Sequence, residues 1–452
     1  MLFNSRNWLP EVFSNKDFLS RDVIAGITIA TILIPQSMAY AMLAGLEPIY
    51  GLYASFIPVS IAALFGSSRY LATGPVAMVS LLTAVAAGSL AGGQSDLYIY
   101  FAVLLAFSVG LFQVLLSLAK AGRFFETIPR HVIVGFTSAA ALIIAASQFH
   151  KIVGASKIGL NDLSNISFFL SNSSLNGQAI LISLAAFAVV YVMKNKSQNS
   201  TINNFAALTA VIVSILASNI FVYNGPIVGY IPDGFPAFTI PSFGSTEIPF
   251  LLFAIHTLII TFVGFMEAMA VSQRLSFKMA VRESQELKDN EASKFQTNQE
   301  LFGQGLANIS SSLSGSYPVS GSFSRSSVSV TANGFSGFTS IVTSITVGLT
   351  LLYATDLLFY LPQATLGVII ILAVLPLIEF RKMKEMYKDN TKEGIVTWAT
   401  FFSTILFPIL NLEIYEGITT HIWTGIVFGF VLSLILDKFC LLYTSPSPRD
   451  RG

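Results

Sequence analysis

The segment Gly315-Ser-Tyr-Pro-Val-Ser-Gly-Ser-Phe-Ser-Arg-Ser-Ser-Val-Ser-Val-Thr-Ala-Asn-Gly334 is polar, and two strongly apolar segments flank it. Its proline and central glycine predict a break between two helices, because proline lacks an amide hydrogen and glycine tolerates unusual dihedral angles. A new helix is expected to begin at Ser322 or Phe323, with its free N–H groups and positive dipole end facing the preceding gap. Arg325 is the lysine or arginine that we place at membrane depth. A helix start of this kind, buried in a bilayer, is a candidate anion site.

The same pattern occurs earlier, in Ser67-Ser-Arg-Tyr-Leu-Ala-Thr-Gly-Pro-Val-Ala-Met-Val-Ser-Leu-Leu82. Gly74 and Pro75 predict another helix start there, with the proline in the first turn. Two interrupted hydrophobic segments in corresponding halves of a chain indicate the central site of a transporter. The alternative for each segment is an ordinary helix-loop-helix corner.

Composition places the chain among membrane proteins. Of its 452 residues, 53% are hydrophobic and 11% are charged, whereas about 25% are charged in a soluble globular domain. The net charge of +1 gives no reason to expect a nucleic-acid partner. The single cysteine, Cys440, excludes an internal disulfide framework, and the four histidines lack metal-binding spacing, so we predict neither a metal nor a cofactor. The serine-rich segment contains no GxSxG motif, and we predict no enzyme.

We predict an all-α polytopic protein with fourteen hydrophobic segments, of which the third and tenth are too short for a complete crossing of about 20 residues. The segments are 22–45, 50–66, 75–90, 97–119, 128–149, 177–193, 203–223, 250–272, 299–315, 323–332, 335–354, 357–378, 394–411 and 417–438.

These segments divide into two sets of seven. Residues 21–223 form the first predicted repeat, 250–438 the second, and 224–249 a connecting loop rich in proline and glycine. An odd number of crossings in each repeat makes the second repeat inverted relative to the first. Residues 1–20 suit an interfacial segment. Residues 439–452 resemble a translated sequencing adapter, and we expect them to form a disordered tail of artefactual origin.

Positive charges define the predicted topology. Twenty lysines and arginines fall on the side that contains the N-terminus, and two, Lys151 and Lys157, fall on the other. This bias places both termini in the cytoplasm, in a plasma or inner membrane. The charged stretch from Arg274 to Glu300 is predicted to be a solvated inner loop. Thr297-Asn-Gln-Glu300 has the form of a capping box, so a helix is expected to start there.

Polar residues inside the predicted spans are candidates for function. Gln36 follows a proline in an otherwise apolar helix, and Tyr40, four residues on, shares its face. The alternative role for this pair is to hold neighbouring helices together. Glu267 lies inside the eighth span, where an ionised carboxylate is costly, and it is a candidate proton carrier. Its alternative role is a fixed ion pair with Arg325.

Four motifs, in order, resemble the SulP family of sulfate permeases and anion transporters, which includes the relatives prestin and pendrin. They lie in residues 22–53, in residues 65–77, in Asn298-Gln-Glu-Leu301 with Gly305-Leu-Ala-Asn-Ile309, and in Tyr317-Pro-Val-Ser-Gly-Ser-Phe-Ser-Arg325. The likeness covers residues from about 18 to 438. Members usually continue into a cytoplasmic STAS domain, and this chain stops where that domain should start, so we expect a truncated member.

The resemblance implies a fold of fourteen segments in two inverted repeats, with a core domain that moves against a gate domain as an elevator. It also implies an anion held between half-helices three and ten, with starts at Gly74, Pro75 and Ser322. The implied substrate-binding residues are Gln36, Tyr40, Val76, Phe323, Ser324 and Arg325. Glu267 matches an acidic position linked to cation coupling, and a glutamate there implies a proton.

The function that follows is proton-coupled uptake of an inorganic anion, with sulfate as the leading substrate. One alternative is a bicarbonate or chloride transporter or an anion exchanger, in which Glu267 is structural. A more distant alternative is a nucleobase carrier of the same architecture, against which Arg325 argues because such a site would be uncharged. The expected partners are the anion, the proton and the lipid bilayer, and a homodimer is left open.

Overall fold

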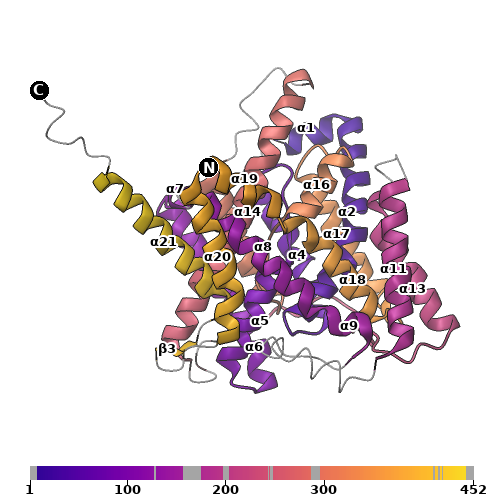
Figure 1. Cartoon of the computed structure of the whole chain (residues 1–452). Coiled ribbons are helices and arrows are strands. Elements are labelled where there is room, and N and C mark those ends of the chain that lie inside the picture. Colours follow the sequence, from indigo (N-terminus) through magenta and orange to yellow (C-terminus); the bar gives the residue numbers. More distant parts are fainter. Residues whose placement is uncertain are drawn as a thin grey trace, which may run out of the picture. The chain divides into compact units, whose positions relative to one another are not determined.

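The computed structural model describes residues 8–126, 129–155, 175–196, 203–242, 244, 248–286, 296–410, 413–415, 418–419 and 421–443. These residues are mostly helical (Figure 1). The elements are α1 (Leu9–Ser14), α2 (Lys16–Leu43), α3 (Pro48–Ala54), α4 (Ile57–Phe65), β1 (Ala72–Gly74), α5 (Ala77–Ala91), α6 (Ser95–Leu118), α7 (Gly122–Glu126), α8 (Arg130–Ser147), α9 (Phe149–Val153), α11 (Gly177–Lys196), α13 (Ala206–Ile220), α14 (Phe250–Glu286), α15 (Thr297–Leu313), β2 (Ser320–Ser322), α16 (Phe323–Thr331), α17 (Phe338–Tyr353), η3 (Asp356–Leu358), α18 (Gln363–Val374), η4 (Leu375–Leu377), α19 (Phe380–Asp389), α20 (Thr391–Leu410), β3 (Glu413–Tyr415), β4 (Ile418–Thr419) and α21 (Ile422–Tyr443).

A helix occupies each of the fourteen predicted segments. Within the described residues, 8 helical stretches are long and apolar enough to cross a membrane, and four further apolar helices are shorter. Two of the shorter ones, α5 and α13, fall in the first half of the chain. The polytopic helical class is therefore confirmed, whereas the number of crossings remains a prediction.

The helices differ from the prediction at three places. The segment predicted at 50–66 consists of two helices, because Pro58 cannot donate a backbone hydrogen bond and fits in the first turn of α4. The loop predicted from Arg274 is wrong up to Glu286, since α14 continues through it, and residues 287–295 lie outside the described part. The helix α19 was not predicted, because most of its residues are charged and the sequence therefore shows no apolar segment, although one face of the helix buries Met383.

The predicted capping box is also wrong, although α15 does begin at Thr297. Gln296 is the N-cap residue, and no side-chain hydrogen bond caps this helix. The Glu300 carboxylate instead accepts hydrogen bonds from the backbone of Ser67 and Ser68, 233 and 232 residues away in the sequence. A long-range contact has therefore displaced the local one that the pattern favours.

The chain forms two compact units, each built from separate parts of the sequence. The first contains residues 1–125, 148–157 and 173–373, and the second contains 126–147, 158–172 and 374–452. In the second unit, α8 packs on α20 so closely that a Cβ on Gly135 would lie 2.3 Å from the carbonyl oxygen of Thr397. The end of α21 reaches Tyr443, inside the stretch predicted to be disordered, and residues 444–452 are not described.

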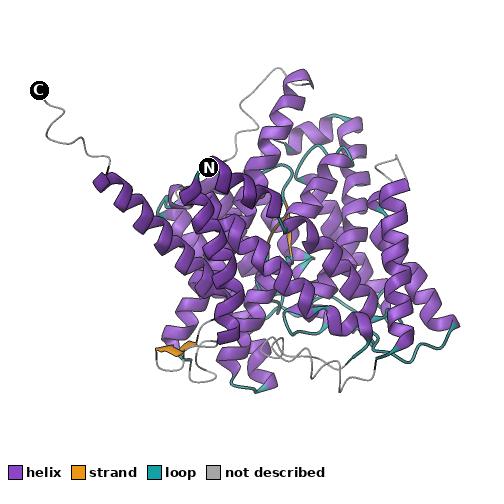
Figure 2. Ribbon diagram, in the orientation of Figure 1, coloured by secondary structure: helices purple, strands orange, loops and turns teal. Residues whose placement is uncertain are grey.

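In the first unit, a short pair of strands lies among the helices (Figure 2). β1 and β2 are antiparallel, with Ala72 opposite Ser322, Thr73 opposite Gly321 and Gly74 opposite Ser320. All six residues are buried. The pairing joins segments that are about half the chain apart, and the sequence analysis did not predict it.

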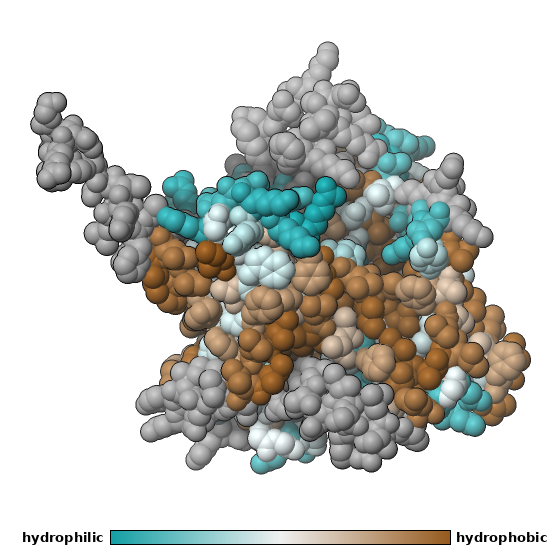
Figure 3. Space-filling view, viewed as in Figure 1, coloured by the Kyte–Doolittle hydropathy of each residue, from teal (hydrophilic) through white to brown (hydrophobic). Residues whose placement is uncertain are grey.

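The outer faces of many helices carry hydrophobic side chains (Figure 3). Leu181, Leu184 and Phe187 on α11 are exposed, as are Phe402 and Leu406 on α20. Helices that expose leucine and phenylalanine in this way face lipid rather than water. The space-filling view also shows hydrophilic side chains gathered around α19.

Near the N-terminus, α1 and α2 hold the connection between α16 and α17, and Figure 1 shows α17 beside α2. Trp8 is buried against Phe335, and the ring of Phe18 stacks on Phe335 with a centroid distance of 3.9 Å. The buried Asp22 carboxylate accepts hydrogen bonds from the backbone N–H groups of Phe335 and Ser336 at 2.6 and 3.0 Å. It also accepts bonds from the hydroxyls of Ser336 and Thr339.

Replacing Asp22 with alanine is expected to lower the free energy of unfolding by about 3 kcal/mol or more, because four buried donors lose their acceptor. The measurement is the Tm of the purified protein in detergent, with Asp17→Ala as the control. Asp17 is on the same helix, but its side chain is 73% exposed, and its Oδ2 atom lies 3.8 Å from Nη1 of Arg21. Equal Tm values for the two variants would show that Asp22 does not anchor this connection.

Candidate functional site

Each strand of the β1–β2 pair leads directly toward the start of a short helix. Ser322 ends β2 and is the N-cap residue of α16, and β1 ends at Gly74, three residues before α5 begins at Ala77. Because the strands are antiparallel, the two helices leave the pair in opposite directions. The positive ends of both helix dipoles therefore face the strand pair from opposite sides.

The start of α5 has no side-chain cap. Its N-cap residue is Val76, a buried side chain with no polar atom, and Pro75 precedes the helix instead of lying in its first turn. The first N–H groups of a helix have no partner within that helix. A buried helix start without a capping side chain is suited to an external acceptor such as an anion.

The start of α16 has a side-chain cap, and its first turn contains the positively charged Arg325. The Ser322 hydroxyl accepts a hydrogen bond from the backbone N–H of Arg325 at 3.5 Å, and it lies 3.3 Å from the Ser324 hydroxyl. Phe323, the first residue of the helix, packs against the cluster that contains Leu71. These contacts fix the first turn of α16 beside β1.

Arg325 is completely buried, and none of its three guanidinium nitrogens has a hydrogen-bond partner in the described part of the chain. A Cβ placed on Gly74 would lie 3.2 Å from its Nη2 atom. The guanidinium thus reaches from α16 across to the end of β1, just before α5. An unpaired buried guanidinium is costly, and its five donors match an oxyanion in the geometry of a planar fork.

Several other buried polar atoms of this unit lack a partner within the described residues, and two of them, Gln36 Oε1 and Glu267 Oε2, belong to predicted site residues. The Tyr317 and Ser80 hydroxyls are also buried, and they interact with each other. Buried polar groups are nearly always hydrogen-bonded, so each of these exceptions leaves bonding capacity that water or a ligand can satisfy.

These side chains are also electrostatic neighbours. Tyr40 interacts with Arg325 and Glu267, and Tyr317 interacts with Arg325, Tyr40 and Ser80. The set combines residues from α2, α5, α14 and α16 with the residue just before Pro318. The structure therefore brings hydroxyl donors, one cation and one carboxyl group to the half-helix starts.

Glu267 and Arg325 interact electrostatically, but no ion pair joins them in the described residues. The carboxyl oxygen Oε2 and all three guanidinium nitrogens remain without partners. The alternative of a fixed ion pair between these residues is therefore not what this structure contains. The Glu267 carboxyl oxygen and the Arg325 guanidinium can therefore still form hydrogen bonds to water or a ligand.

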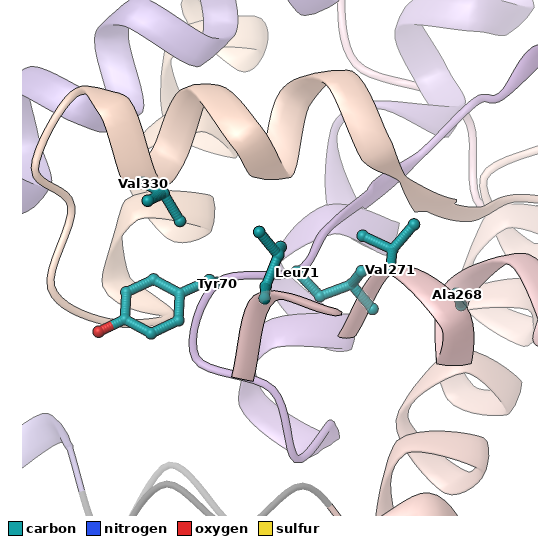
Figure 4. Close-up of a cluster of buried hydrophobic side chains, with 6 residues drawn as sticks. Tyr70, Leu71, Ala268, Val271 and Val330 are labelled. Carbon is teal, nitrogen blue, oxygen red and sulfur yellow. The ribbon is translucent and has the colours of Figure 1, made fainter. Parts of the chain in front are cut away.

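One side of the site is closed by hydrophobic side chains (Figure 4). Leu71 lies between Val330 of α16 and the α14 residues Val271 and Ala268. Gly321 permits this approach, because a Cβ there would lie 2.7 Å from a methyl group of Leu71. Apolar packing on this side keeps water away from the strand pair and strengthens the electrostatic interactions within it.

The sequence analysis missed two residues of this group, Tyr317 and Ser80. Tyr317 stands directly before Pro318 in the interrupted segment, and Ser80 lies one turn into α5, where its N–H donates to the Val76 carbonyl. Their positions beside the predicted breaks were a usable signal. Val76, by contrast, contributes its backbone position and no polar side chain.

The sequence of this chain is similar to those of known transport proteins. The profile of the sulfate permease family matches residues 19–400. "Sulfate transporter 4.1, chloroplastic" of Arabidopsis thaliana is 34% identical over 449 residues, which cover 97% of this chain and 61% of that protein. "Probable sulfate transporter Rv1739c" of Mycobacterium tuberculosis (strain ATCC 25618 / H37Rv) is 29% identical, over 94% of this chain and 73% of that protein. The chain thus spans less than two thirds of the length of the Arabidopsis relative.

Two solved structures share the fold. The murine Slc26a9 anion transporter in the inward-facing state has a TM-score of 0.81 at 20% identity, over 97% of this chain and 71% of that one. The transmembrane domain of the cyanobacterial bicarbonate transporter BicA has a TM-score of 0.72 at 20% identity, over 92% of this chain and 97% of that one.

Replacing Gly74 with alanine is expected to weaken anion binding, because the added methyl group would crowd the Arg325 guanidinium and because Gly74 has a φ of 147°. We expect a sulfate dissociation constant raised about tenfold, which corresponds to about 1.4 kcal/mol. Binding is measured by the sulfate-dependent rise in Tm. Gly92→Ala is the control, since its φ is also positive and no atom lies within 4 Å of the added Cβ. Unchanged affinity in Gly74→Ala would place the anion elsewhere.

Proposed function

Because the chain belongs to the sulfate permease family, we propose that it is a secondary transporter of an inorganic anion, with sulfate favoured and a proton as the coupling ion. One observation carries this proposal. Arg325 is buried, has no hydrogen-bond partner in the described residues, and lies against Gly74 in the strand pair that leads to the starts of α5 and α16. The Arabidopsis and mycobacterial relatives are named as sulfate transporters, which supports the choice of anion.

A sulfate ion suits the groups available at this point. Its four oxygens could accept hydrogen bonds from the Arg325 guanidinium, from the free N–H groups at the start of α5, and from the hydroxyls of Ser324 and Tyr317. Charge-assisted bonds of this type are roughly twice as strong as neutral ones. Gln36 and Tyr40, on one face of α2, would complete the wall of the site.

Glu267 is the proposed proton carrier. Sulfate carries two negative charges, and moving it into a negative compartment costs about 2.3 kcal/mol per charge for each 100 mV. One proton on Glu267 would halve that cost but not cancel it. The unpaired Oε2 of Glu267, in electrostatic contact with Arg325, supports this assignment.

The finer architecture is part of the same proposal. We propose fourteen segments in two inverted repeats, 21–223 and 250–438, with α5 and α16 as corresponding half-helices. The compact unit that holds the anion site would be the core domain of an elevator cycle, and the second unit would be the gate. Both termini would be cytoplasmic, as the distribution of positive charge indicates. Of the two lysines on the opposite side, Lys157 lies outside the described residues.

The second candidate is a transporter of bicarbonate or chloride. The shared fold with BicA, a bicarbonate transporter, favours it, and one proton would fully neutralise such a monovalent anion. Competition by bicarbonate or chloride against labelled sulfate in proteoliposomes separates the two candidates. If bicarbonate or chloride inhibits the uptake of labelled sulfate at a lower concentration than unlabelled sulfate does, the monovalent anion is the preferred substrate.

The proton role predicts that sulfate uptake into proteoliposomes rises when the outside is made more acidic than the inside. Glu267→Gln is expected to abolish this response, because the amide cannot release a proton, while the purified protein keeps its Tm. Glu47→Gln, which alters an exposed carboxylate, serves as the control. If Glu267→Gln keeps the full pH response, coupling does not pass through this residue.

Arg325→Ala is expected to raise the KM for sulfate more than about tenfold, because charge-assisted hydrogen bonds contribute roughly 1.5–3 kcal/mol. Arg381→Ala is the matched control, since that side chain is 93% exposed and pairs with Glu385 on the surface. The assay is the initial rate of labelled sulfate uptake against concentration. Wild-type KM in Arg325→Ala would remove this residue from the site.

A further inference from the structure

One face of α15 carries three polar side chains at intervals of four residues: Glu300, Gln304 and Asn308. Each is at most 1% exposed. Residues four apart lie above one another on a helix, so these side chains form a single polar stripe. The proposed function makes no use of this stripe.

The first two members of the stripe hold β1 and the turn before it. Glu300 Oε2 accepts hydrogen bonds from the N–H groups of Ser67 and Ser68 at 2.8 and 2.9 Å. Gln304 Nε2 donates to the Thr73 hydroxyl at 2.8 Å and to Glu300 Oε1 at 3.0 Å. The amide of Gln304 is therefore attached to the middle residue of β1.

The third member holds the other strand. Asn308 Oδ1 accepts a hydrogen bond from the backbone N–H of Val319, directly before β2, at 2.8 Å. Its Nδ2 atom donates to Gln113 Oε1 of α6 at 3.0 Å. The hydrogen bond to α6 thus orients the Asn308 side chain, while its other hydrogen bond holds the residue before β2.

The spacing of these contacts matches the strand pair. Four residues of α-helix rise about 6 Å, and paired strands lie about 4.8 Å apart. Consecutive amides of the stripe can therefore meet consecutive strands. A ladder of three residue pairs is at most marginally stable alone. Its register and separation here depend on α15.

We propose that Gln304 and Asn308 are positioning residues that set the separation of the two half-helix starts, and thereby the affinity and the choice of anion. Their partners Thr73 and Val319 each lie one residue before the opposed pair Gly74 and Ser320. Arg325 lies against Gly74. A shift of either strand would therefore move the guanidinium relative to the α5 start, although neither amide side chain touches the anion. This inference rests on the proposed function.

The test uses Gln304→Leu, Asn308→Leu and the milder Gln113→Leu, which removes the support behind Asn308 and leaves its bond to Val319. Ser310→Ala is the control, because that hydroxyl bonds within α15, to the Ala307 carbonyl. Labelled sulfate uptake into proteoliposomes gives KM and kcat, and competition by chloride gives selectivity. We expect the sulfate KM to rise at least tenfold for Gln304→Leu and Asn308→Leu and about threefold for Gln113→Leu. We expect kcat to change less than threefold, and the relative inhibition by chloride to shift at least threefold.

Two further measurements separate positioning from general damage. Thr73→Val and Gln304→Leu are expected to be non-additive in KM, since either change removes the same bond. Hydrogen exchange of the peptide that contains Val319 is expected to quicken at least tenfold in Asn308→Leu, while Tm falls less than in Asp22→Ala, because one buried donor loses its acceptor instead of four. Faster exchange with unchanged KM would overturn the proposal. A fall in kcat as large as the rise in KM, with a Tm lowered as far as in Asp22→Ala, would also overturn it.

Failure of the proposed function gives a different result. If the wild-type protein takes up neither sulfate, bicarbonate nor chloride, the transport proposal fails. The hydrogen-exchange comparison would still decide whether Asn308 holds the strand, because it requires no substrate. Unaltered exchange in Asn308→Leu would overturn the inference by itself.

Discussion

Backbone N–H and C=O groups inside a bilayer need partners, because there is no water to hydrogen-bond them. Two helices of this chain are interrupted, and the interruption exposes backbone on both. The β1–β2 pair resolves this problem by joining the two interruptions to each other. The same pairing then determines where α5 and α16 begin and in which directions they run.

The interrupted helices also bring positive charge to the β1–β2 pair. Each interrupted helix presents the positive end of its dipole, and Arg325 adds a full positive charge. No carboxylate in the described residues forms an ion pair with that arginine, and Glu267 interacts with it electrostatically without a hydrogen bond. Buried positive charge is unfavourable unless anions or ordered water compensate it, and this is the physical basis of the proposed anion site.

Local sequence signals predicted the helices and both interruptions. Proline and glycine near positions 75 and 321 marked the breaks, and the long apolar runs marked the helices. Contacts between distant residues were beyond such signals. Nothing near Glu300 indicates that its carboxylate would bind Ser67 and Ser68, and nothing in α14 indicates that the helix continues past Arg274. The group around Arg325 was predicted in part, since Tyr317 and Ser80 have no pattern of their own.

Several helices of the first unit touch through glycine, with backbone against backbone. A Cβ on Gly110 would lie 2.6 Å from the Gly305 carbonyl oxygen, and one on Gly51 would lie 2.0 Å from that of Ser37. Contacts without side chains leave no room for gradual adjustment by substitution. A larger residue at either glycine would therefore force two helix backbones apart, so the separation of these helices is set by the backbone itself.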